Sequence, residues 1–99
     1  MQAENLIEIN NFCVNHNIEI SFISSLQQTG LIEVTTQEET VFIEAEQLKQ
    51  LEKYIQFYYE LDINLEGIET ITHLLQRIKA MQDEIQMLKN RLRLYEPDE

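Results

Sequence analysis

The apolar residues in the last third of the chain recur every seven positions. From Ile71 onward they fill two rows, which correspond to the a and d positions of four heptads. The rows are Ile71, Ile78, Ile85 and Leu92, and Leu74, Met81, Leu88 and Tyr95. A straight surface helix drifts off a strict seven-residue repeat, so this pattern favours a partner helix over packing on the chain's own core. We therefore expect a long dimerisation helix over residues 64–95, with all of these residues except Tyr95 in the contact.

Charged residues beside the two rows indicate whether the two helices of the dimer would run parallel or antiparallel. Glu84 and Arg91 occupy g positions, and Lys89 and Glu96 occupy e positions. Glu84 would meet Lys89 and Arg91 would meet Glu96 in a parallel dimer. Each exposed pair contributes only about 0.2–1 kcal/mol. Ile at a with Leu at d also favours a parallel pair.

Shorter patterns before residue 30 predict two helices joined by a tight turn. Residues 6–7 are expected to form a short strand, followed by a helix that ends near Asn17, a residue that tolerates the left-handed conformation. A second helix is expected over 19–29, with Gly30 as its stop. The inward positions are Ile9, Phe12 and Cys13 in the first helix, and Phe22, Ile23 and Leu26 in the second. This arrangement predicts a helix-turn-helix.

The pattern then changes to a hairpin followed by a third helix. Residues 31–34 and 40–43 are apolar and β-branched, and the polar stretch 35–39 separates them, which predicts a two-stranded wing. From Glu44 a third helix is expected, and its apolar positions should close the core. Those positions are Leu48, Leu51, Tyr54, Ile55, Tyr58 and Leu61. The chain therefore divides into a head (1–63), a dimerisation helix (64–95) with Asn64 as its N-cap, and a frayed tail (96–99).

Charge and cysteine content limit the partners and the compartment. The chain has 99 residues and a net charge of −11. Residues 1–63 hold eleven acids and two bases, a net −9, whereas the remainder holds seven acids and five bases, a net −2. Such a charge repels nucleic-acid phosphates, so the head should prefer a basic partner or be merely soluble. With a single cysteine, no membrane-length apolar run and no signal peptide, we expect a cytoplasmic protein.

The sequence offers no set of residues suited to catalysis or to a metal. Cys13 and His16 lie one helical turn apart, but two ligands do not close a tetrahedral shell and no second pair follows. Neither His16 nor His73 has a nucleophile at a suggestive spacing, and there is no glycine-rich phosphate loop. We therefore expect no enzymatic activity, no metal and no cofactor.

The order helix, turn, helix, wing, third helix and long arm resembles the MerR-like winged-helix family. Two segments carry this likeness: residues 9–32, which end in Gly-Leu-Ile, and residues 46–51, Glu-Gln-Leu-Lys-Gln-Leu. Residues 60–78, ELDINLEGIETITHLLQRI, resemble one branch, the CbpM-type chaperone modulators. The resemblance implies a mostly α fold: a winged helix-turn-helix with a small β-hairpin wing and a long C-terminal dimerisation helix.

Departures from the DNA-binding pattern of that family are equally informative. DNA-binding members carry Arg and Tyr on the second helix and an aromatic-Arg pair on the wing. The corresponding places here hold Ser21, Ser24 and Ser25, then Thr40 and Val41. A protein that binds DNA through several phosphate contacts draws most of its affinity from Lys and Arg at those places. Nucleic acid is therefore not the expected partner.

The CbpM-type resemblance implies a protein partner, the J domain of a CbpA-type co-chaperone. These modulators restrain the co-chaperone's stimulation of the chaperone DnaK, and J domains generally present a basic helix. We expect the acidic contact to include Glu33, Glu38, Glu39, Glu44 and Glu46, around the wing. The alternatives are a DNA-binding MerR-type transcription regulator and an acidic protein that mimics DNA.

The resemblance also bears on the expected homodimer. MerR-type dimers usually pair their long helices antiparallel, against the e and g charges of this chain. We favour the antiparallel arrangement, because the arm must also pack on the partner's head and a few exposed ion pairs cannot outweigh that burial.

Overall fold

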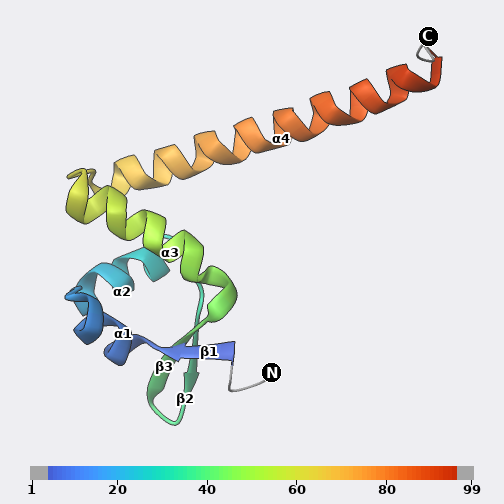
Figure 1. Cartoon of the computed structure of the whole chain (residues 1–99). Helices are drawn as coiled ribbons and strands as arrows, with labels where there is room; N and C mark the ends of the chain where they lie inside the picture. The colour runs from blue at the N-terminus through green and yellow to red at the C-terminus, as the bar shows by residue number, and fades with distance from the viewer. Residues whose placement is uncertain (1–4, 96–99) are drawn as a thin grey trace. The chain divides into compact units, whose positions relative to one another are not determined.

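The computed structural model describes residues 5–95, so the predicted frayed tail, 96–99, lies outside the described residues. The chain is mostly helical with one small sheet, as the sequence predicts (Figure 1). The elements are β1 (Leu6–Glu8), α1 (Ile9–His16), α2 (Ile20–Gln28), β2 (Val34–Gln37), β3 (Thr40–Glu44), η2 (Ala45–Gln47), α3 (Leu48–Ile55), η3 (Gln56–Glu60) and α4 (Leu65–Tyr95). Residues up to Glu69 form one compact unit, the head, and those from Thr70 form a second.

The turn between α1 and α2 is built by the residues the sequence indicates. Asn17 adopts the left-handed conformation with φ of 61°, and the N–H of Ile18 donates to the carbonyl of Cys13 at 2.9 Å. After α2, Gly30 has φ of 84°, and the N–H of Leu31 donates to the carbonyl of Leu26 at 3.0 Å. Left-handed residues of this kind end helices by satisfying their last carbonyls. The two predicted helices are therefore confirmed to within one residue at each end.

The sheet has the order β1-β3-β2, with both pairings antiparallel. The hairpin of β2 and β3 differs from the prediction, because Thr35, Thr36 and Gln37 belong to β2 and only Glu38 and Glu39 form the turn. Both glutamates have positive φ, 51° and 68°. Two such residues in succession define the type I′ turn, which matches the twist of the strands. The predicted wing is thus present, but its first strand begins at Val34 and its turn is shorter than expected.

The core of the head draws on every helix and on the sheet. All six inward positions predicted for the first two helices are buried. The buried set is Ile9, Phe12, Cys13, Ile18, Phe22, Ile23, Leu26, Ile32, Ile43, Leu51, Tyr54 and Ile68. The hydroxyl of Tyr54 donates to the carbonyl of Leu31 at 3.3 Å, so this buried aromatic residue has a polar partner.

The third helix departs from the predicted stripe in its last turn. After Ile55 the helix widens into the π-turn η3, and Tyr58 and Leu61 are exposed rather than part of the core. Phe57 instead packs against the core. A π-turn breaks the regular spacing of the α-helix. In this turn the residue that packs inward is Phe57, and the expectation that Tyr58 and Leu61 close the core was wrong.

The start of α4 is fixed by a side-chain cap and by a buried residue in its first turn. The side-chain oxygen of Asn64 accepts from the N–H of Gly67 at 2.7 Å, which confirms Asn64 as the N-cap. Ile68, one residue further, is fully buried in the head core. The first turn of α4 thus belongs to the head, while the helix runs on to Tyr95.

Candidate interaction surfaces

The five glutamates expected to form the acidic contact fall into two groups on the head. Glu38 and Glu39 are exposed at the tip of the hairpin. Glu33 precedes β2 and Glu44 ends β3, at the opposite end of the same strands. Because a strand rises about 3.3 Å per residue, β2 separates the groups by roughly 13 Å. The structure therefore brings Glu33 and Glu44 together at the base of the wing and places the tip pair apart from them.

Glu46 joins the group at the base through η2. The side-chain oxygen of Gln47 accepts from the N–H of Glu33 at 2.9 Å, and its amide donates to the carbonyl of Glu33 at 2.8 Å. This paired contact fixes the backbone of Glu33 beside η2. Glu33 and Glu46 are exposed, and Glu44 is half-buried. Three carboxylates therefore lie on neighbouring segments at the base of the wing.

The exposed face of α2 carries no charge. Ser21 and Ser24 are exposed and Ser25 is half-buried, while Thr40 and Val41 are half-buried in β3. The first Lys or Arg of the whole chain is Lys49. The helix-turn-helix and wing therefore present no cation to a phosphate backbone.

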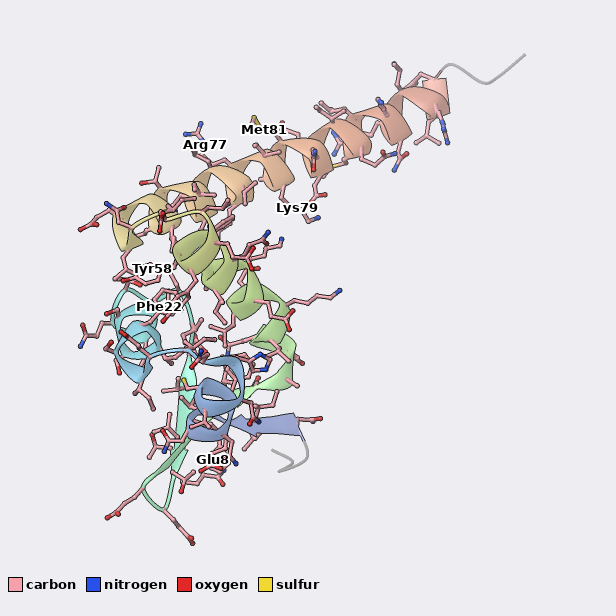
Figure 2. All side chains as sticks on the ribbon, turned by 60° about the vertical axis from the view of Figure 1, so that its left-hand side comes forward. Glu8, Phe22, Tyr58, Arg77, Lys79 and Met81 are labelled. Atoms are coloured by element: carbon pink, nitrogen blue, oxygen red, sulfur yellow. The ribbon has the colours of Figure 1, made fainter. Side chains whose placement is uncertain are left out.

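The apolar a and d rows predicted for α4 lie in the second unit, from Thr70 onward, and most of their side chains are exposed. Leu74, Ile78, Met81, Ile85, Leu88 and Leu92 are each about half exposed, between 45% and 54%, and Ile71 is half-buried. Figure 2 shows Met81 and Arg77 on one side of α4 and Lys79 on the other. Lys79 pairs with Asp83 at 3.1 Å, one turn further along. The helix is thus amphipathic: Lys79 and Asp83 lie away from the apolar rows, whereas Arg77 flanks them.

A hollow at the junction of α1 and α2 was not expected from the sequence. Val14, Ile20 and Tyr59 line a groove of about 560 Å³ together with Glu19, and Cys13 and Ile18 also border it. We call it the α1–α2 groove. Its three exposed walls come from separate segments, so no local periodicity could have identified them.

The structure also shows the surroundings of Cys13 and His16, the two residues considered as metal ligands in the sequence. Cys13 is buried, and burial raises the pKa of its thiol. The His16 ring packs against Phe12, with 4.3 Å between ring centroids. Among residues 5–95 no group of three or more His, Cys, Asp or Glu side chains is arranged to hold a metal ion. No helix in the same range is long and apolar enough to cross a membrane.

Two short helices joined by a tight turn, a β-hairpin wing and a long C-terminal helix define a winged helix-turn-helix protein. A family model described as "MerR HTH family regulatory protein" matches residues 7–90, and the chain belongs to that family. The MerR-like resemblance is therefore confirmed. Comparisons with curated proteins and with solved structures gave no match.

Proposed function

We propose that this MerR-family protein regulates a protein rather than a gene: it binds the J domain of a CbpA-type co-chaperone and lowers its stimulation of DnaK. The observation that supports this most directly is the absence of any Lys or Arg before Lys49, in a head that carries eleven acids up to residue 63. The regulator is proposed to act without catalysis or a cofactor, by covering a basic surface of its partner.

Physical chemistry disfavours DNA as the ligand of this head. Binding to duplex DNA depends on cations that displace counterions from phosphates, and typical specific binders make about 6–10 such contacts. Lys49 and Lys53 are the head's two cations, and both lie on α3, outside the helix-turn-helix and the wing. The positions that family members use for DNA hold serine, threonine and valine here, and glutamates lie beside those on the wing.

The same charge suits a basic protein surface. The CbpM-type resemblance implies a J domain, which generally presents a basic helix to DnaK. Complementary charge raises the association rate and excludes wrong partners. Glu33, Glu44 and Glu46 at the base of the wing, with Glu38 and Glu39 at its tip, are the carboxylates we assign to this contact. A head bound over the basic helix would compete with DnaK for it.

We propose further that the protein is a homodimer paired through α4. Half-exposed large apolar side chains at a and d positions over four heptads leave a long apolar strip in contact with water. Extended exposed apolar surface of this kind is typical of interfaces between proteins. An antiparallel pair remains the arrangement we favour.

Binding measurements with two ligands test the proposal. The purified protein is titrated with an isolated CbpA-type J domain and with random duplex DNA at two salt concentrations, and DnaK ATPase stimulation is followed in parallel. We expect J-domain binding that suppresses stimulation, and no measurable affinity for DNA at ordinary ionic strength.

A charge-reversed variant supplies the second part of this test. Glu33→Lys, Glu44→Lys and Glu46→Lys together should weaken J-domain binding, while Glu52→Lys, an exposed change on α3, serves as the control. Unchanged affinity in the triple variant would overturn the wing assignment. Absence of J-domain binding by the wild type would overturn the function itself.

The second candidate function is that of a DNA-binding transcription regulator. It is favoured by the family match, since the matching model describes helix-turn-helix regulatory proteins. Sequence-dependent DNA binding with a steep salt dependence would establish it.

A further inference from the structure

Four of the five exposed large apolar side chains described in the head lie close to one another. Among its described residues the large apolar side chains that remain exposed are Val14, Ile20, Tyr58, Tyr59 and Leu61. Three of them, Val14, Ile20 and Tyr59, line the α1–α2 groove, and Tyr58 lies against Tyr59 with 5.1 Å between ring centroids. The wing, by contrast, has no large apolar side chain exposed. Exposed apolar groups that cluster in a hollow are typical of a binding site.

The groove is held in shape by contacts on each side. The hydroxyl of Tyr59 accepts from the backbone N–H of Glu19 at 3.1 Å, which ties η3 to the start of α2. Phe22 stacks on Tyr58 with centroids 4.5 Å apart and meets Tyr59 edge-on at 5.5 Å. Figure 2 shows Phe22 and Tyr58 next to one another. A groove fixed in this way loses little entropy when it is occupied.

Charge around the groove has one sign. Glu19 lines it, and Asp62 lines a neighbouring hollow of about 360 Å³ that shares Tyr59 and includes Tyr58. No Lys or Arg lines either hollow. Aromatic faces attract ammonium and guanidinium groups. Carboxylates beside such faces add to that attraction, so the surroundings favour a cation with an apolar neighbour.

We propose that the α1–α2 groove is the apolar anchor site of the partner interface, and that it receives a cationic amphipathic helix. An apolar side chain of that helix fills the groove between Val14 and Ile20. A Lys or Arg one turn away lies over Tyr58 and Tyr59, close to Glu19 and Asp62. This deepens the proposed function and rests on it for the identity of the partner. Protein interfaces combine an apolar centre with a polar rim, and the wing glutamates alone supply only a rim.

A lysine placed in the groove tests this assignment. Val14 is 78% exposed, so Val14→Lys removes an apolar wall and adds a repulsive charge without disturbing the core. The matched control is Asn15→Lys, which adds the same charge at the next exposed residue of α1, outside the groove. We expect Val14→Lys to weaken J-domain binding about tenfold or more and Asn15→Lys to change it less than about twofold. Equal effects of the two variants, with wild-type binding intact, would overturn the groove and leave the proposed function standing.

A second probe keeps the groove testable if the wild type does not bind the J domain. The probe is a short helical peptide with leucine on one face and arginine on the other, added to isotope-labelled full-length protein. Chemical-shift changes centred on Val14, Ile18, Ile20 and Tyr59 are the expected result, and changes confined to the wing or α4 would overturn it. The alternative occupant of the groove is a second copy of this chain, and sedimentation of the Val14→Lys variant without any partner tests for it. If the substitution changes self-association, a second copy fills the groove and the assignment to a partner helix is wrong.

Discussion

Gly67 lies in the first turn of α4, where the backbone passes close to the side chain of Ile63. A Cβ atom at this position would lie 2.7 Å from Cγ2 of Ile63 and 3.1 Å from Oδ1 of Asn64. Ile63 is β-branched and packs against the core, so it has little freedom to move. The same Asn64 oxygen caps the helix by accepting from the N–H of Gly67. These contacts give a physical reason for Asn64 and Gly67 in the Asn-Leu-Glu-Gly run.

Replacement of Gly67 by Ala should therefore destabilise the protein. In an unobstructed helix this substitution stabilises by about 1 kcal/mol. Here the added methyl group is overpacked, and we expect a net loss of about 1–3 kcal/mol. Urea denaturation followed by circular dichroism measures the change, at one fixed protein concentration because the proposed dimerisation would make stability depend on concentration.

The control for this prediction is a double-mutant cycle. Ile63→Ala removes Cγ2, so Gly67→Ala made in that background should regain its usual stabilising effect. A stabilising Gly67→Ala in the otherwise natural chain would show that the close approach is not a constraint.

At the scale of elements, the sequence identifies those whose ends are marked by residues with a strong local preference. Asn17 and Gly30 end their helices in the left-handed conformation, which Asn and Gly tolerate better than other residues, so α1 and α2 were predictable. Glu38 and Glu39 adopt the same conformation without that preference, and the short hairpin turn was missed. The π-turn after Ile55 was missed because its register follows tertiary packing of Phe57 rather than local periodicity.

The candidate surfaces also divide into those that the sequence predicts and one that only the fold brings together. The heptad rows of α4 and the carboxylates of the wing are visible in the sequence as spacing and charge. The α1–α2 groove is not, because Val14, Ile20 and Tyr59 come together only in the fold. Tyr59 belongs to the π-turn, which the sequence does not predict.

The hairpin turn leads to a prediction about stability. Left-handed conformations cost non-glycine residues about 1–2 kcal/mol each, and Asn-Gly is the preferred pair in a type I′ turn. The double variant Glu38→Asn with Glu39→Gly should therefore stabilise the head by about 1–2 kcal/mol, measured as a shift in the urea midpoint. Glu38→Gln with Glu39→Gln removes the same charges but keeps the conformational cost, so it should change stability much less. If the two variants stabilise the head equally, the gain comes from removing charge repulsion between the two glutamates and not from the backbone conformation.

At the scale of the whole molecule, the sign of the charge changes along the chain. Residues 1–63 carry a net −9, whereas residues 77–95 hold five bases and two acids, a net +3. The family fold is retained, but cations are missing from the elements that would meet DNA and are concentrated on the arm. Over the whole of α4 five bases nearly balance four acids, so two paired arms would repel one another far less than two acidic heads would. If the head binds the proposed partner and the arm forms the proposed dimer, each unit can be altered without the other.

The arm offers the most direct test of that separation. Ile78→Ala with Ile85→Ala removes two a-position side chains, and each should cost the proposed dimer about 2–5 kcal/mol if it is buried there. Sedimentation velocity should then show a monomer at concentrations where the natural chain is a dimer. Gln76→Ala with Asn90→Ala, two exposed changes on the outer face of the same helix, should leave the mass unchanged.

Because the wing and the α1–α2 groove lie within one head, the monomeric variant should still bind the J domain, one head to one domain. An unchanged mass in the Ile78 and Ile85 variant would refute the role of the arm, and loss of J-domain binding on dissociation would show that the binding surface spans two copies.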